Sequence, residues 1–156
     1  RNFPENWIWA QSNNFSNNNL SITASLATIP WKNTSFAGFI VGLYYKSNLY
    51  RFTTYRNTVT KEIRYDSNKF YWQLKQKDLM LDLTIEKGHK AGLLYAPGKI
   101  DMVPRVHEYL DGNIYLKLYD HKGTILEDQT TSAAVEIIGD VSKLINMAGG
   151  LKSGLK

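Results

Sequence analysis

Apolar and polar residues alternate along most of the chain, and a period of two is the pattern of half-buried β-strands. The segment 20–26 shows it most clearly, because leucine, isoleucine and alanine alternate there with serine and threonine. The segment 36–45 is apolar at nearly every position, which predicts a strand in a central position of the sheet. Runs of these two kinds recur at regular spacing along the chain, and we expect about eleven short strands in all.

Short polar segments separate these runs and predict tight turns. Two of them are Lys46-Ser47-Asn48 and Asp66-Ser67-Asn68, and His121-Lys122-Gly123 is a third. The dipeptide Asp111-Gly112 is a strong signal for a two-residue turn, so the segments 105–110 and 113–120 are predicted to form a hairpin. Strands joined by such short turns pair antiparallel.

Only the end of the chain has a helical pattern. Asp140 is a suitable N-cap, and the apolar residues that follow it recur at helical spacing as Val141, Leu144, Ile145 and Ala148. Glycines at 149 and 150 predict its end, and residues 149–156 are expected to be a frayed tail. The chain is therefore predicted to be one all-β domain over residues 1–156, an antiparallel β-barrel or strongly curved sheet with a short C-terminal helix.

The segment 7–15 has an unusual face if it forms a strand. Side chains alternate across a strand, so one face carries Trp7, Trp9, Gln11, Asn13 and Phe15. Indoles and a phenyl ring beside two amides suit the wall of a ligand cavity, with apolar surface to bind and polar groups to orient a molecule. The alternative is that Gln11 and Asn13 only bond to nearby backbone at a loop-rich edge.

Composition narrows the classes of protein. Of 156 residues, 43% are apolar and 21% charged, which indicates a folded globular protein. The absence of cysteine excludes disulfides, cysteine-based zinc sites and thiol catalysis. The chain begins at Arg1, without an initiator methionine or a signal peptide, and is expected to be a processed form or a fragment of a longer protein.

The formal net charge is +5, and basic residues are concentrated between positions 46 and 77. They alternate with apolar residues along the predicted strands, as they do on the solvated face of an antiparallel sheet. This pattern argues against a nucleic-acid partner and favours a weak attraction to an anionic membrane surface.

Few residues are candidates for chemistry. The three histidines His89, His107 and His121 lie in separate strands or turns without the spacing of metal ligands, so no metal site is predicted. Glu108 shares a face with Val106 and Leu110 and is a candidate interior acid, because apolar surroundings favour the protonated form that a general acid requires. Glu136, in the apolar run SAAVEIIG, is a second candidate. The alternative for both is an ordinary outward glutamate on a half-exposed strand.

The order and the residues of several runs resemble the C-terminal part of the tocopherol cyclase family. These runs are WIWAQSNNF, SITASLATIP, FAGFIVGLYY, YRFTTY, LLYAPGKIDMVPRVHEYLDG and SAAVEIIGD. The residues matched to the family's motifs are Trp7, Trp9, Gln11, Asn13 and Phe15 in the first, Ala96 and Pro97 in the Ala-Pro segment, the acid Glu108 after it, and Ala134, Glu136 and Gly139 in the closing motif.

The resemblance implies a lipocalin-like pair of β-barrel halves, of which this chain is the second and an upstream half of the same protein is its partner. It also implies a cofactor-free reaction on a prenylated hydroquinone. In that reaction Glu108 or Glu136 protonates a double bond, and the indole faces of Trp7 and Trp9 stabilise the cation. Gln11 and Asn13 hold the quinol oxygens, and a ring hydroxyl closes a chromanol.

Three classes of function follow. The first is a cyclase-like enzyme, of the isomerase class, acting on a prenylated apolar ligand. The second is a non-catalytic lipid- or isoprenoid-binding module with the same fold. The third is an interaction or structural domain whose barrel is filled with its own side chains. Such a filled interior would leave no room for a ligand inside the barrel and would exclude the first two classes. An interior acid beside the aromatic face is the feature that separates an enzyme from a carrier.

Overall fold

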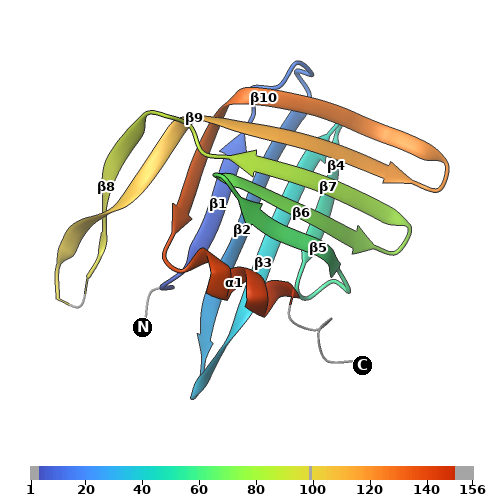
Figure 1. The fold of residues 1–156 in the computed structure, drawn as a ribbon. Coiled ribbons are helices and arrows are strands. Elements are labelled where there is room, and N and C mark those ends of the chain that lie inside the picture. Colours follow the sequence, from blue (N-terminus) through green and yellow to red (C-terminus); the bar gives the residue numbers. More distant parts are fainter. Residues whose placement is uncertain (1–3, 99, 150–156) are drawn as a thin grey trace.

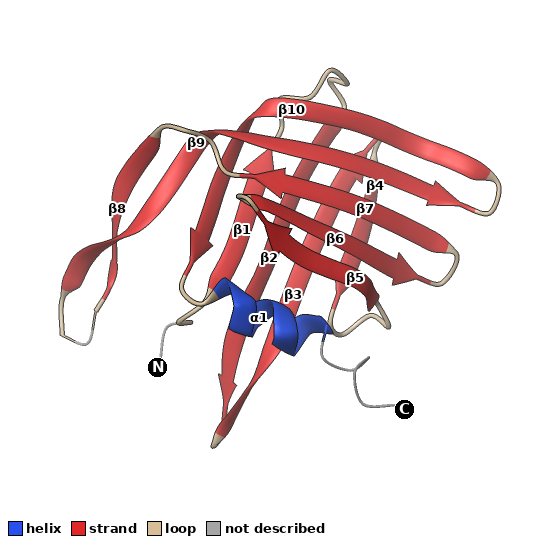
Figure 2. Cartoon of the chain, in the orientation of Figure 1, coloured by secondary structure: helices blue, strands red, loops and turns tan. Residues whose placement is uncertain are grey.

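The computed structural model describes residues 4–98 and 100–149, which form ten strands and one helix (Figures 1 and 2). The strands are β1 Trp7–Ser12, β2 Leu20–Trp31, β3 Thr34–Tyr45, β4 Asn48–Thr53, β5 Val59–Asp66, β6 Lys69–Gln76, β7 Leu79–Glu86, β8 Ala91–Pro97, β9 Met102–Asp120 and β10 Gly123–Ile138, and the helix is α1 Val141–Gly149. None of the described residues forms a helix long and apolar enough to cross a bilayer.

All ten strands belong to one antiparallel sheet, in the order β4-β3-β2-β1-β10-β9-β7-β6-β5, with β8 paired to the first part of β9. The sheet curves until β5–β7 face β1–β3, as Figure 1 shows. Its hydrogen-bonded ladder does not close, so β4 and β5 remain as edges. The predicted strongly curved all-β sheet with a short C-terminal helix is confirmed, and a closed barrel is not formed.

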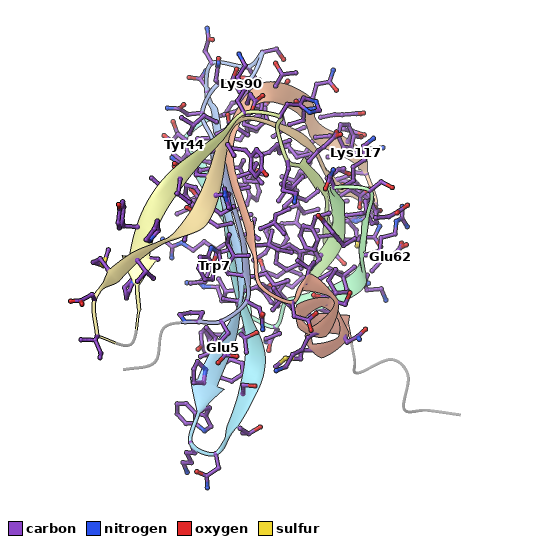
Figure 3. The ribbon with its side chains drawn as sticks, turned by 60° about the vertical axis from the view of Figure 1, so that its left-hand side comes forward. Glu5, Trp7, Tyr44, Glu62, Lys90 and Lys117 are labelled. Atoms are coloured by element: carbon purple, nitrogen blue, oxygen red, sulfur yellow. The ribbon has the colours of Figure 1, made fainter. Side chains whose placement is uncertain are left out.

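The space inside the curved sheet is packed with the protein's own side chains (Figure 3). Phe52, Phe70 and Trp72 are its largest fully buried residues, surrounded by leucines and isoleucines from every wall of the sheet. The Trp72 indole donates a hydrogen bond to the Thr60 hydroxyl at 3.1 Å, so its one polar group is satisfied. The interior is therefore a packed core, as in the third class of function.

Helix α1 packs across one open end of this core, against β5, β3 and β1. The Asp140 carboxylate accepts a hydrogen bond from the Lys143 amide at 2.9 Å, which confirms the predicted N-cap. Leu144 is fully buried, and Val141, Ile145 and Ala148 pack against the core. The second glycine of the predicted stop and most of the predicted tail, residues 150–156, lie outside the described residues.

Two of the predicted turns join neighbouring strands as tight hairpins. Lys46 and Ser47 have φ values of 48° and 65°, and Ser67 and Asn68 have 48° and 69°. Two consecutive left-handed residues make the turn whose twist matches that of paired strands. The third predicted turn joins β9 to β10 and contains Gly123 at a φ of 128°.

The predicted hairpin at Asp111-Gly112 is wrong, because β9 continues through it as one strand of 19 residues. The ladder between β9 and β10 instead shifts register here, which is a β-bulge. Gly112 is required by close packing, since a Cβ there would lie 2.5 Å from Val135 Cγ2. Strand β10 is likewise long, with 16 residues, so the sheet has fewer and longer strands than the eleven short ones expected.

The bulge changes which side chains of β9 face the core. After the bulge, Gly112 and Ile114 are buried on the core side of β9. Before the bulge, the residue that packs against the core is Tyr109 and not Glu108. The part of β9 before the bulge leaves the main sheet together with β8 (Figure 1). We call this two-stranded extension, residues 91–97 and 102–110, the β8–β9 arm.

Candidate functional site

The two faces of β1 pack against different clusters. Ile8 and Ala10 point into the core, whereas Trp7 and Trp9 lie on the outer face of the sheet. Trp7 is only 7% exposed, because it packs against Ala27 of β2 and against Ala96 and Val106 of the β8–β9 arm. The arm therefore lies against the outer face of the sheet and covers the first tryptophan (Figure 3).

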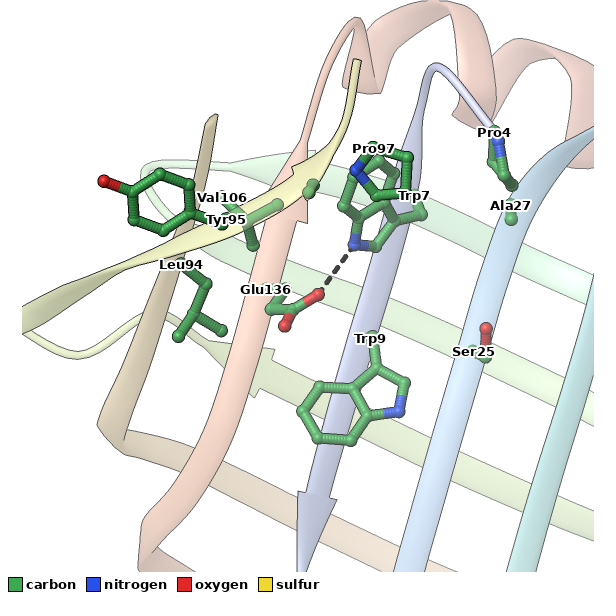
Figure 4. Close-up of a pocket in the computed structure, with 11 residues that line it drawn as sticks. Pro4, Trp7, Trp9, Ser25, Ala27, Leu94, Tyr95, Pro97, Val106 and Glu136 are labelled. Atoms are coloured by element: carbon green, nitrogen blue, oxygen red, sulfur yellow. Dashed lines mark hydrogen bonds between the residues drawn. The ribbon is translucent and has the colours of Figure 1, made fainter. Parts of the chain in front are cut away.

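A cavity of about 390 Å³ lies between this outer face and the arm (Figure 4). Strands β1, β2 and β10 form one wall, and β8 with β9 forms the other. Its lining residues are Pro4, Trp7, Trp9, Ser25, Ala27, Leu94, Tyr95, Ala96, Pro97, Val106 and Glu136. Among these described residues Glu136 alone carries a charge, so a single carboxyl group faces an otherwise largely apolar space.

The carboxyl group of Glu136 is held by a tryptophan. Trp7 Nε1 donates a hydrogen bond to Glu136 Oε2 at 2.8 Å, drawn as the dashed line in Figure 4. Trp9 is the residue directly opposite Glu136 in the ladder between β1 and β10. The structure thus brings Trp7, Trp9 and Glu136 together in one half-buried site.

Glu108, the other candidate acid, is directly opposite Glu136 in the ladder between β9 and β10. Side chains at such positions have Cβ atoms about 5 Å apart. Glu108 does not line the cavity and is half-buried. The expectation of an interior face shared with Val106 and Leu110 is wrong, since the bulge puts Val106 and Glu108 on the outer face and leaves Leu110 69% exposed.

The other three residues of the predicted β1 face, Gln11, Asn13 and Phe15, do not line the cavity. Strand β1 ends at Ser12, so the alternation that would align Asn13 and Phe15 with Trp7 is interrupted. Phe15 is buried in the core on the other side of the sheet, and Gln11 and Asn13 are exposed. The prediction that all five residues share one face is wrong for Phe15.

Sequence reasoning missed most of the opposite wall. Leu94 and Tyr95 lie in the run AGLLYAP, which predicts a strand but not its neighbours, and nothing local indicates that the arm folds against β1. The only signal was the Ala96-Pro97 segment of the family resemblance, which does reach the cavity. The arm and the turn that joins its two strands also expose large apolar side chains, namely Leu93, Tyr95, Ile100, Met102 and Val103.

Titratable groups elsewhere form no metal site in the part of the chain that the structure describes, where no three His, Asp or Glu side chains gather around a common point.

Asp111, beside the bulge, has a structural role. Its carboxylate accepts hydrogen bonds from the backbone amides of His89, at 3.1 Å, and Lys90, at 3.2 Å. The His89 hydrogen bond is the main reason that the pKa of Asp111 is lowered from its ordinary value of 3.8.

A family model described as tocopherol cyclase-like matches residues 1–139. The chain belongs to the tocopherol cyclase-like family. The matched range includes every residue that lines the cavity, while helix α1 lies beyond it. Comparison with curated proteins and with solved structures gave no significant match. Trp7, Trp9 and Glu136, three residues that the sequence resemblance matched to the first and last runs, all line the cavity.

Proposed function

We propose that this tocopherol cyclase-like chain binds a prenylated hydroquinone in the outer-face cavity and closes a chromanol ring by protonating a double bond of the prenyl chain. The observation that carries the proposal is the Glu136 carboxyl group, which faces a largely apolar cavity beside two indoles. A volume of about 390 Å³ lies within the range of small-molecule sites.

The reaction needs only an acid and a cation-stabilising surface. The carboxyl proton of Glu136 adds to the less substituted carbon of a trisubstituted double bond, whose π pair forms the new C–H bond and leaves a tertiary cation. A ring hydroxyl oxygen donates a lone pair to the cation, and its proton returns to the Glu136 carboxylate. The product is an isomer of the substrate, the acid is restored, and no cofactor is consumed.

The two tryptophans support different parts of this step. Their π faces attract a cation, and the attraction is stronger where water is excluded. The Trp7 N–H donates to Glu136, and a hydrogen bond to a carboxylate is stronger than one to a neutral acid. The bond between Trp7 and Glu136 therefore gains strength while the proton leaves, which stabilises the transition state more than the bound substrate.

Glu108 has a supporting role in this proposal. Two carboxylates at directly opposed positions of a ladder repel each other. Glu108 can therefore influence the Glu136 carboxyl group without touching a bound ligand, because only Glu136 of the pair lines the cavity.

The test is to replace each acid by its amide and to measure both binding and turnover of a prenylated hydroquinone. Glu136→Gln is expected to bind with nearly unchanged affinity and to lose about 10²- to 10⁴-fold in turnover, the usual contribution of a general acid. Glu108→Gln should lose less. Glu127→Gln is the matched control, since Glu127 is an exposed glutamate on the same strand that does not line the cavity.

Full turnover by Glu136→Gln would contradict the assignment of the acid. A wild-type chain that binds the hydroquinone in the cavity without converting it would contradict the catalytic step and support the alternative, a non-catalytic isoprenoid-binding module. Failure of the wild-type chain to bind any prenylated hydroquinone would overturn both readings.

A further inference from the structure

We infer that the cavity continues as a shallow groove across the outer face of β2 and β3, and that this groove binds the linear apolar tail of the ligand. The inference rests on the proposed function, which places the reacting double bond and ring beside Glu136. It adds a second binding region and a preference for tail length.

A second depression lies next to the cavity on the outer face of the sheet. Its volume is about 150 Å³, and it is lined by Ser25, Ala27, Ile29, Gly38, Phe39, Ile40 and Tyr55. Ser25 and Ala27 also line the cavity. The two spaces therefore meet over β2, with Trp7 and Trp9 on one side and Ile40 and Tyr55 on the other.

Strand register explains why a groove forms at this place. One row of directly opposed residues runs Trp7, Ala27, Gly38, and the adjacent row runs Trp9, Ser25, Ile40. Small side chains on β2 thus lie beside the large indoles on β1. At Gly38 a Cβ would lie 2.8 Å from Ile29 Cγ1, so only glycine lets Ile29 lie across the groove floor.

The chemistry of the groove suits a hydrocarbon chain. None of its described lining residues carries a charge. At its far end Ile40 is 60% exposed and Tyr55 is 81% exposed, so the described residues leave apolar surface uncovered there. A bound tail would cover this surface, and burial of apolar surface favours binding.

The span of the groove sets the length of tail that it can hold. From Glu136 on β10, the path crosses β1 and β2 to reach β3, and strands lie about 4.8 Å apart, which makes the path about 14 Å. An extended isoprene unit spans roughly 5 Å, given C–C bonds of about 1.5 Å. The groove therefore has room for about three isoprene units beyond the reacting one.

The experiment measures the affinity of hydroquinones that share one head and carry one to five isoprene units. For the wild-type chain, affinity should rise by at least about tenfold with the first added units, because each buried methylene contributes, and then level off once the groove is full. Ile40→Glu places a charge in the groove at an exposed position and should abolish this rise while leaving the affinity of the shortest ligand unchanged. Tyr55→Ser, which removes the far wall, should reduce the rise.

Tyr44→Glu is the matched control, because Tyr44 is an exposed residue of β3 that does not line the groove. It should leave the dependence on tail length intact. Two results would overturn the inference, provided that the shortest ligand still binds in the cavity. One is an equal rise of affinity with tail length in Ile40→Glu, and the other is no such rise in the wild-type chain. If even the shortest ligand did not bind to the wild-type chain, the proposed function would fail as well.

Discussion

At the scale of single residues, Trp7 has two functions that can be separated. Its ring packs against Ala27, Ala96 and Val106 and so forms part of the cavity wall, and its N–H holds one oxygen of Glu136. A phenyl ring can replace much of the first function but cannot replace the second, because it has no donor.

Trp7→Phe is therefore expected to reduce turnover more than binding. A hydrogen bond to a charged group contributes about 1.5–3 kcal/mol, which corresponds to a loss of about 10- to 100-fold in kcat if the bond acts mainly on the carboxylate. Steady-state kinetics separate kcat from KM, and Trp9→Phe, which removes an N–H that is not bonded to Glu136 in the structure, is the comparison. Equal loss of kcat in both variants would argue that Trp7 acts only through packing.

Alternation along the chain grouped the two indoles, whereas only the family resemblance grouped them with Glu108 or Glu136. Alternation indicates which residues share a face of a strand, and it does so for Trp7 and Trp9. It cannot show where a strand ends, and for this reason Phe15 was placed on the wrong face. The approach of Glu136 to Trp7 joins residues 129 positions apart and depends on the pairing of β1 with β10.

At the scale of elements, the bulge in β9 decides how the arm is placed. The pair Asp111-Gly112 predicts a turn because the two residues commonly occupy left-handed conformations. Here Gly112 is not among the residues with positive φ, and tight packing on Val135 accounts for the glycine instead. The Asp111 carboxylate bonds the amides of His89 and Lys90, which joins the bulge to the loop that leads into β8.

This contact should be sensitive to acid. The pKa of Asp111 is lowered in the folded protein, so its stabilising contribution is fully present above the ordinary value of 3.8 and is lost as the pH falls through the lower folded value. Amide NMR shifts and hydrogen exchange of His89 and Lys90 should therefore remain constant on acidification until below pH 3.8 and then change together. A midpoint at or above the ordinary value would contradict the role of Asp111, and Asp111→Ala should show rapid exchange of both amides at neutral pH.

At the scale of the whole molecule, the curved sheet has its core on one side and its cavity on the other. The sequence pattern predicted an all-β curved sheet correctly, since alternation and turn signals persist from end to end. It also suggested that a ligand would lie inside the barrel. That expectation is wrong, because Phe52, Phe70 and Trp72 with their neighbours pack the interior.

The sequence could not distinguish the inner from the outer face of β1, because both faces are rich in apolar residues. The outer face is apolar because the β8–β9 arm lies against it, and that contact joins distant parts of the chain. A filled interior was expected to exclude ligand binding. The cavity outside the sheet removes that objection, since it is formed by a second layer rather than by the barrel.

The measurement that tests this account most directly is photolabelling with a prenylated hydroquinone that carries a diazirine next to its first double bond, followed by mass spectrometric mapping of the adducts. If the outer-face cavity is the site, the adducts will lie on its lining residues, chiefly Trp7, Trp9, Leu94 and Val106, and unlabelled hydroquinone will compete with them. Competed adducts on Phe52, Phe70 or Trp72, in the interior of the sheet, would contradict the account.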